Sequence, residues 1–227
     1  MRSLHELLVG AINGQGPDAA SRRRVLAAFG VAAAAPVALG ADALAQVQGE
    51  GRNNKKKRRN KRKKDKKGDI AILNYALTLE HLEYAFSRDG LPTYGAGDFP
   101  AGVYDRLKEI LDHEKAHGDA LTQTIQGMGG TPVAETRYVF GSTTSAQFLE
   151  AAQVLENIGV SAYDGAIAGI KDGDLQTVGA TIATVEARRA SCLNNVNGDD
   201  PFPDAFDTLL TQEEVLAAAG DFIVACS

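Results

Sequence analysis

Apolar residues recur at helical spacing through the last two thirds of the chain. They form two neighbouring rows over about 69–87, which predicts a first helix buried on more than one side. The same period predicts further helices over about 102–128, 144–172 and 174–196, the last capped by Asp174. Because no stretch alternates apolar and polar residues convincingly, the pattern indicates an all-α domain built as a four-helix bundle.

Glycine- and proline-rich segments separate these helices. Residues 93–102 form a loop, and the run Gly-Gly-Thr-Pro at 129–132 ends the second helix. Residues 131–143 then make a long connection between the second and third helices, long enough to cross the end of a bundle or to run along one side. Beyond a proline-rich loop, Thr211 and Glu214 have capping-box spacing, which predicts a short C-terminal helix.

Carboxylates inside the predicted core are the main chemical signal. Each of the four long helices has one glutamate within an apolar stretch: Glu80, Glu114, Glu156 and Glu186. An unpaired buried carboxylate costs several kcal/mol, so these positions need a reason. His117 follows Glu114 at i+3 and projects to the same side. Convergent glutamates with Glu-x-x-His are how helix bundles bind two iron or manganese ions.

Several strings around these residues resemble the exported ferritin-like domain family, which includes ferritin-like and desiccation-related proteins. The strings are Leu-Glu-His-Leu-Glu at 79–83, Glu-Lys-Ala-His at 114–117, Leu-Glu-Asn-Ile-Gly-Val-Ser-Ala-Tyr at 155–163, Glu-Ala-Arg-Arg at 186–189 and Pro-Phe-Pro-Asp-Ala-Phe-Asp at 201–207. The resemblance covers about residues 69–223 and implies a ferritin-like bundle. The family's metal-ligand positions match Glu80, Glu114, His117, Glu156 and Glu186.

The fourth helix departs from the family pattern. Glu-x-x-His should recur there, but position 189 is arginine, whose guanidinium does not ligate metals. Arg189 is therefore expected to point inward and pair with Glu156 or Glu186. Three alternatives stay open: a two-metal site, a one-metal site, and a metal-free core in which Arg189 replaces the metal charge. Glu83, one turn from Glu80, is the alternative ligand. His81 and His113 are expected at the surface or beside the site. Tyr163 is expected in the core, and a hydrogen-bond donor near the site is its alternative role.

The activity that the resemblance implies is iron or peroxide handling in stress. An iron site can oxidise Fe(II) with oxygen or peroxide, or remove peroxide, so an oxidoreductase is one hypothesis. A metal-free, structural stress protein is the second hypothesis. A DNA-protecting ferritin relative with a lysine-rich arm is the third. Storage of iron as mineral would need an assembly of many subunits.

The charge distribution divides the 227 residues into three parts. The formal net charge is −5, with 44% hydrophobic and 23% charged residues, which excludes a wholly disordered or collagen-like chain. Residues 51–67 carry 12 of the 24 Lys and Arg and one acid, for a net +11. Residues 68–227 carry a net −16. The predicted domains are a leader over 1–45, a polybasic arm over 46–68 and the bundle over 69–227.

The leader has the order of an export signal. Basic residues including Arg22 and Arg23 precede an apolar stretch over 25–41, and a small-x-small cleavage site ends at Ala45. The paired arginines resemble the twin-arginine motif, which implies the twin-arginine export machinery as a partner. The apolar stretch is shorter than the ~20 residues that span a membrane. The sequence therefore predicts a periplasmic or extracellular protein.

The polybasic run at 52–67 has no apolar or aromatic residue and is predicted to be a disordered arm. We expect it to bind an anionic envelope component, such as phospholipid or acidic polysaccharide, by charge. Without aromatic residues, any nucleic-acid binding would be nonspecific. A solvated linker that folds back on the acidic bundle is the alternative. The cations expected to contact the partner are Lys55, Lys56, Lys57, Arg58, Arg59, Lys61, Arg62, Lys63 and Lys64.

Two cysteines, Cys192 and Cys226, are the only ones in the chain. In an oxidising compartment an even pair indicates a disulfide, here one that ties the C-terminal tail to the fourth helix. Such a bond would contribute on the order of 2–4 kcal/mol. The alternative is two unpaired thiols.

Overall fold

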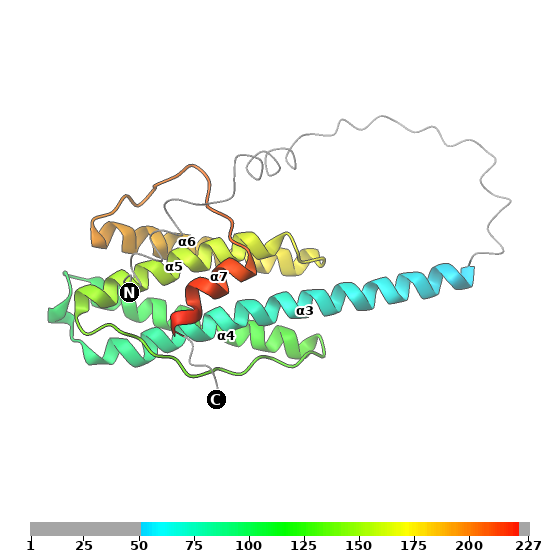
Figure 1. The fold of residues 1–227 in the computed structure, drawn as a ribbon, viewed down its shortest axis with the longest axis horizontal. Helices are drawn as coiled ribbons and strands as arrows, with labels where there is room; N and C mark the ends of the chain where they lie inside the picture. Colours follow the sequence, from blue (N-terminus) through cyan, green and yellow to red (C-terminus); the bar gives the residue numbers. More distant parts are fainter. Residues whose placement is uncertain (1–50, 223–227) are drawn as a thin grey trace.

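Four long helices form the molecule, as the hydrophobic pattern predicts (Figure 1). The computed structural model describes residues 51–222. The long helices are α3 (Gly51–Gly90), α4 (Val103–Gly127), α5 (Ser145–Ile167) and α6 (Gly173–Asn197), and a short α7 (Gln212–Ala219) follows them. The described residues contain no β-strand, so the all-α four-helix bundle with a short C-terminal helix is confirmed. The most extensive contacts join α5 to α6 and α3 to α4, and α3 also packs on α5.

Side-chain caps fix where the helices begin. The Thr144 hydroxyl accepts the amide of Gln147 at the start of α5. Thr211 and Glu214 form the predicted capping box of α7. At α6 the prediction was wrong by two residues, because Asp172 is the cap rather than Asp174. Only a carboxylate just before the first turn reaches the free amides of that turn, and Asp172 accepts two of them.

Two of the three apolar clusters in the described residues lie on either side of the middle of the bundle. An aromatic cluster includes Phe86, Phe99 and Phe148, and the rings of Phe86 and Phe148 stack with centroids 4.5 Å apart. An aliphatic cluster occupies the other side, formed by Leu73, Ala76, Leu77, Leu121, Ile125, Ile182 and Ala183 together with Tyr163. The interior glutamates lie between the two clusters in the sequence of every long helix. The fold thus separates the centre of the bundle from solvent along its axis.

The long connection between α4 and α5 runs along one side of α3. Asn74 donates to the Thr131 carbonyl at 3.2 Å and accepts from the Val133 amide at 2.6 Å. The ring of His81 lies 3.2 Å from the Val133 carbonyl oxygen, so this histidine contacts the connection. Further along, Arg88 pairs with Glu135 at 2.9 Å. The connection therefore lies against α3 from Asn74 to Arg88.

The polybasic segment is helical, so the prediction of a disordered arm was wrong. Residues 51–67 are the first turns of α3 and extend beyond the rest of the bundle (cyan end, Figure 1). Lysine and arginine are good helix formers, and the packed part of α3 supplies the costly nucleus from which the helix propagates. Lys61 and Asp65 add an i,i+4 ion pair at 2.8 Å. The missing apolar residues leave this segment without packing but do not prevent it from being a helix.

Some predictions concern residues that lie outside 51–222. The export signal over 1–45, with Arg22 and Arg23, is among them, and so is Cys226. Cys192 is exposed on α6, and its bond to Cys226 stays a prediction. Within the described part of the chain, no helix combines the length and apolar character needed to cross a membrane.

Candidate metal centre

Each long helix places two positions, three residues apart, at the middle of the bundle. Residues at i and i+3 share one face of a helix, so each pair points the same way. The pairs are Glu80 and Glu83 on α3, Glu114 and His117 on α4, Glu156 and Gly159 on α5, and Glu186 and Arg189 on α6. The structure brings together all the glutamates that the sequence singled out, with His117 and Arg189.

All five carboxylates of the centre are buried. Glu114 and Glu186 have no exposed surface, and Glu83, which the sequence offered only as an alternative ligand, is 6% exposed. Arg189 is 7% exposed. Burial of a carboxylate without compensation is costly, so the cluster requires cations, protons or hydrogen bonds.

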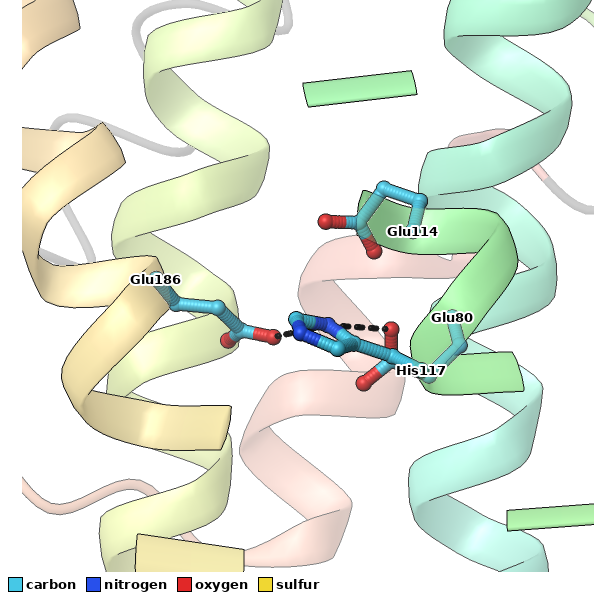
Figure 2. A group of neighbouring side chains, drawn as sticks. All are labelled: Glu80, Glu114, His117 and Glu186. Carbon is cyan, nitrogen blue, oxygen red and sulfur yellow. Dashed lines mark ion pairs between the residues drawn. The ribbon is translucent and has the colours of Figure 1, made fainter. Parts of the chain in front are cut away.

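Four of these residues converge on one point (Figure 2). Glu80, Glu114, His117 and Glu186 each offer a ligand atom, and these atoms lie within 4.8 Å of one another. His117 Nδ1 lies 3.3 Å from Glu80 Oε2 and 3.7 Å from Glu186 Oε1. Oxygen and nitrogen ligands bind a transition metal at about 2 Å, which puts the ligands of one ion about 3–4 Å apart. The spacing of the group, up to 4.8 Å, is slightly wider than this and comes close to that of the ligands of one ion.

Unpartnered polar atoms fill this group. Glu80 Oε2, His117 Nδ1, Glu114 Oε2 and both carboxylate oxygens of Glu186 are buried without a hydrogen-bond partner in the described chain. Glu114 Oε1 faces the guanidinium of Arg189. The buried Asp69, at the end of the bundle, shows the contrast. Its two oxygens accept the amides of Lys171 and Asp172 at 2.7 and 3.2 Å. An acid that serves structure is satisfied here, whereas the acids of the centre fit a metal ion.

Arg189 lies against the other side of the same cluster. Its Nε donates to Glu156 Oε2 at 2.8 Å, and its Nη2 contacts Glu114 Oε1 and lies 3.6 Å from Glu186 Oε1. The inward orientation expected from the sequence is observed, with Glu114 as an additional partner. Glu156 is held by this pair and lies outside the group of four around His117. Glu83 also lies outside that group.

The sequence matches the ferritin-like domain over residues 68–199. This chain belongs to the ferritin-like domain family. The crystal structure of a conserved hypothetical protein from Mycobacterium tuberculosis has a similar fold, with a TM-score of 0.51 and 22% sequence identity. That likeness covers 63% of this chain and 99% of the mycobacterial chain. No curated protein matches the sequence. The match to the ferritin-like domain begins after the polybasic segment of α3 and ends before α7.

Tyr163 connects the aliphatic cluster of the ferritin-like domain to the centre. The sequence predicts a core tyrosine, with a hydrogen-bond donor near the site as the alternative, and the structure shows both, because the buried Tyr163 hydroxyl donates to Glu80 Oε1. Tyr163 follows Glu156 by seven residues, two helical turns, and this spacing on one stripe was the available signal. The bond leaves Glu80 Oε2 directed at His117 and fixes how Glu80 faces the ligand group.

Burial also changes the proton affinity of the centre. Burial raises the pKa of Glu80 to about 7, although hydrogen bonds with Glu114 and Tyr163 lower it. Burial also raises the pKa of Glu156 to about 8, although Arg189 lowers it. The pKa values of Glu83, Glu114 and Glu186 are raised well above the usual range for the same reason. Burial lowers the pKa of His117, which favours the neutral imidazole that a metal requires. Without metal, the centre therefore retains protons near neutral pH.

Gly159 makes room for two of the carboxylates. A Cβ atom at this position on α5 would lie 2.5 Å from Glu186 Oε2 and 3.0 Å from Glu83 Oε1. Residue 159 corresponds in its helix to His117 and Arg189, since each follows a central glutamate by three residues. The absence of a side chain on α5 thus admits the carboxylates of α3 and α6.

The substitution Gly159→Ala should destabilise the metal-free protein by about 1–3 kcal/mol, because the new methyl group overpacks the centre. Thermal and urea unfolding in the presence of a chelator measure the change. Gly179→Ala on α6 is the matched control, since its Cβ would lie 3.6 Å from Ile167, an ordinary contact. The control should gain about 0.5–1 kcal/mol of helix propensity. Equal effects of the two substitutions would contradict the proposed crowding.

The metal-free protein should lose stability as the pH rises from about 5 to 9. A raised carboxyl pKa contributes stability that is fully present below the unfolded value of about 4.3 and is lost as the pH rises through the folded value. For Glu80 and Glu156 the folded values are about 7 and about 8. Melting temperatures measured with a chelator at each pH test this, and Glu80→Gln, which cannot ionise, should give a shallower slope. A wild-type slope no steeper than that of Glu80→Gln would refute it.

Proposed function

We propose that the chain is an exported ferritin-like protein that binds divalent iron or manganese and serves in iron or peroxide handling under stress. The observation that carries the proposal is the group of four ligand atoms within 4.8 Å, supplied by Glu80, Glu114, His117 and Glu186. Most of their polar atoms are buried without a partner. Carboxylate and imidazole donors suit iron and manganese.

The charge of the centre supports a divalent ion. Five buried carboxylates face a single buried guanidinium, that of Arg189. One divalent ion would offset two more negative charges, and protons would neutralise the rest, as the raised pKa of Glu156 supports. Bound iron would supply electron transfer to oxygen or peroxide. The chain's own residues keep bulk water away through the two apolar clusters, and Tyr163 orients Glu80.

A metal-free structural protein is the second candidate, and the position of Arg189 favours it. The guanidinium contacts three carboxylates, so it carries part of the compensation that a metal would give. In that case protons on the remaining carboxyls complete the compensation. The two candidates differ in whether the native protein retains a metal.

Anaerobic titration of the chelator-treated chain with Fe(II) or Mn(II) separates these candidates. We expect wild-type protein to retain at least one ion per chain after gel filtration, and Glu114→Gln and His117→Ala to bind at least tenfold more weakly. Glu150→Gln on the exposed face of α5 is the control and should bind like wild type. Elemental analysis of protein isolated from its own cells provides the native metal content. No retained iron or manganese in either preparation would leave the metal-free candidate.

We also propose that export and the polybasic segment place the protein at the cell envelope. The side chains from Lys57 to Lys64 are exposed, and successive residues of a helix differ by 100° in direction, so the positive charges surround α3. The segment has no apolar stripe with which to enter a bilayer. Because a flat lipid surface meets only one side of a helix, this distribution favours an acidic polysaccharide of the envelope as the partner.

In a bacterium with a twin-arginine pathway, we expect the chain in the envelope fraction, beginning at Gln46 and released by about 1 M salt. Replacing Arg22 and Arg23 by lysine should leave unprocessed chain in the cytoplasm. Replacing the nine cations of 55–64 by glutamine should release processed chain into the soluble exported fraction.

Two results would contradict this placement. Unprocessed wild-type chain bound to the chromosome would favour the DNA-protecting hypothesis instead. Binding of the processed chain to anionic phospholipid vesicles, but not to an acidic polysaccharide, would contradict the proposed partner.

A further inference from the structure

We infer that the guanidinium of Arg189 takes the place of a second metal ion, so that the centre binds a single divalent ion. The inference rests on the proposed function, because it concerns the number of ions that the same centre holds. It is carried by the contacts of Arg189 and by the symmetry of the residues around it.

The two halves of the bundle supply matching sets of residues. The α3–α4 pair contributes Glu80 and the sequence Glu114-x-x-His117, and the α5–α6 pair contributes Glu156 and the sequence Glu186-x-x-Arg189. In the first half the i+3 residue is an imidazole with a lone pair for a metal. In the second half the corresponding residue is a permanent cation without one.

Arg189 contacts the carboxylates that would bind a metal ion in the α5–α6 half of the centre. The guanidinium reaches Glu156, the counterpart of Glu80, at 2.8 Å and also contacts Glu114. It lies 3.6 Å from Glu186. Glu114 and Glu186 also belong to the ligand group around His117, so these two carboxylates face both His117 and the guanidinium.

A second ion would have to enter the space that Arg189 fills. Its ligands would be Glu156, Glu114 and Glu186, and each of these already faces the guanidinium. Both positive charges would then lie in a buried site without screening by solvent, where like charges repel strongly. Arg189 is held in place by burial as well as by its pairs, with 7% of its surface exposed. The second position is therefore closed to metal.

The number of Mn(II) ions per chain tests the inference. Full-length protein is stripped with a chelator, loaded anaerobically with Mn(II), passed through gel filtration and analysed for manganese and protein. We expect one ion in wild type and two in Arg189→His, which restores Glu-x-x-His on α6. Arg188→His, at the exposed neighbouring position, is the control and should retain one ion. Electron paramagnetic resonance should show an isolated ion in wild type and an exchange-coupled pair in Arg189→His.

The outcomes separate this inference from the proposed function. Two ions in wild type would overturn the inference and sustain the function, whereas no ion in any variant would overturn the function itself. Arg189→Gln keeps the test decisive if Arg189→His does not fold. Removal of the charge should tighten binding of the first ion at least tenfold. One ion in both Arg189 variants, with unchanged affinity, would show that the guanidinium does not exclude a second ion.

Discussion

The burial of five carboxylates in the middle of a helix bundle is the constraint on which the rest of this structure depends. Like charges so close together cannot all ionise without compensation, and burial alone raises their pKa values. Arg189 and the Tyr163 hydroxyl on Glu80 compensate part of this buried negative charge. Four of the side chains also form a group that could hold a divalent ion. The apolar clusters on either side help to bury these carboxylates, and a less polar surrounding strengthens each of these interactions.

The fold was largely predictable because it follows from local rules. Apolar residues at helical spacing gave the four long helices, and the capping box at Thr211 gave the beginning of α7. The polybasic segment shows the limit of this reasoning. Composition indicates that a segment cannot pack, and residues 57–64 indeed pack against nothing, but continuity with an anchored helix decided its conformation. The cap of α6 is Asp172 and not the predicted Asp174, because the helix begins at Gly173 and the cap must precede its first turn.

The sequence predicts which residues form the centre, but it does not predict which of them contact one another. A glutamate in an apolar stretch is visible in the sequence, so Glu80, Glu114, Glu156 and Glu186 could be selected without coordinates. The rotation and shift of each helix against its neighbours decide which carboxylate Arg189 contacts. They also decide that Gly159 lies against the carboxylates of α3 and α6. The spacing of residues along one sequence does not specify the rotation and shift between helices. For Tyr163 the core position and a donor role were both predictable, but its acceptor, Glu80, was not.

The helical conformation of the polybasic segment sets how far it extends from the bundle. As a helix, residues 51–67 span about 25 Å, roughly three Debye lengths at physiological ionic strength. The acidic remainder of the chain, with a net charge of −16 over 68–227, would be repelled by the anionic partner that we propose for the segment. With such a partner, a helical spacer would hold the bundle and the anionic surface apart, so that solvent ions would screen their repulsion while the cations of the segment stay bound. A collapsed arm of the same composition would bring the two negative surfaces together.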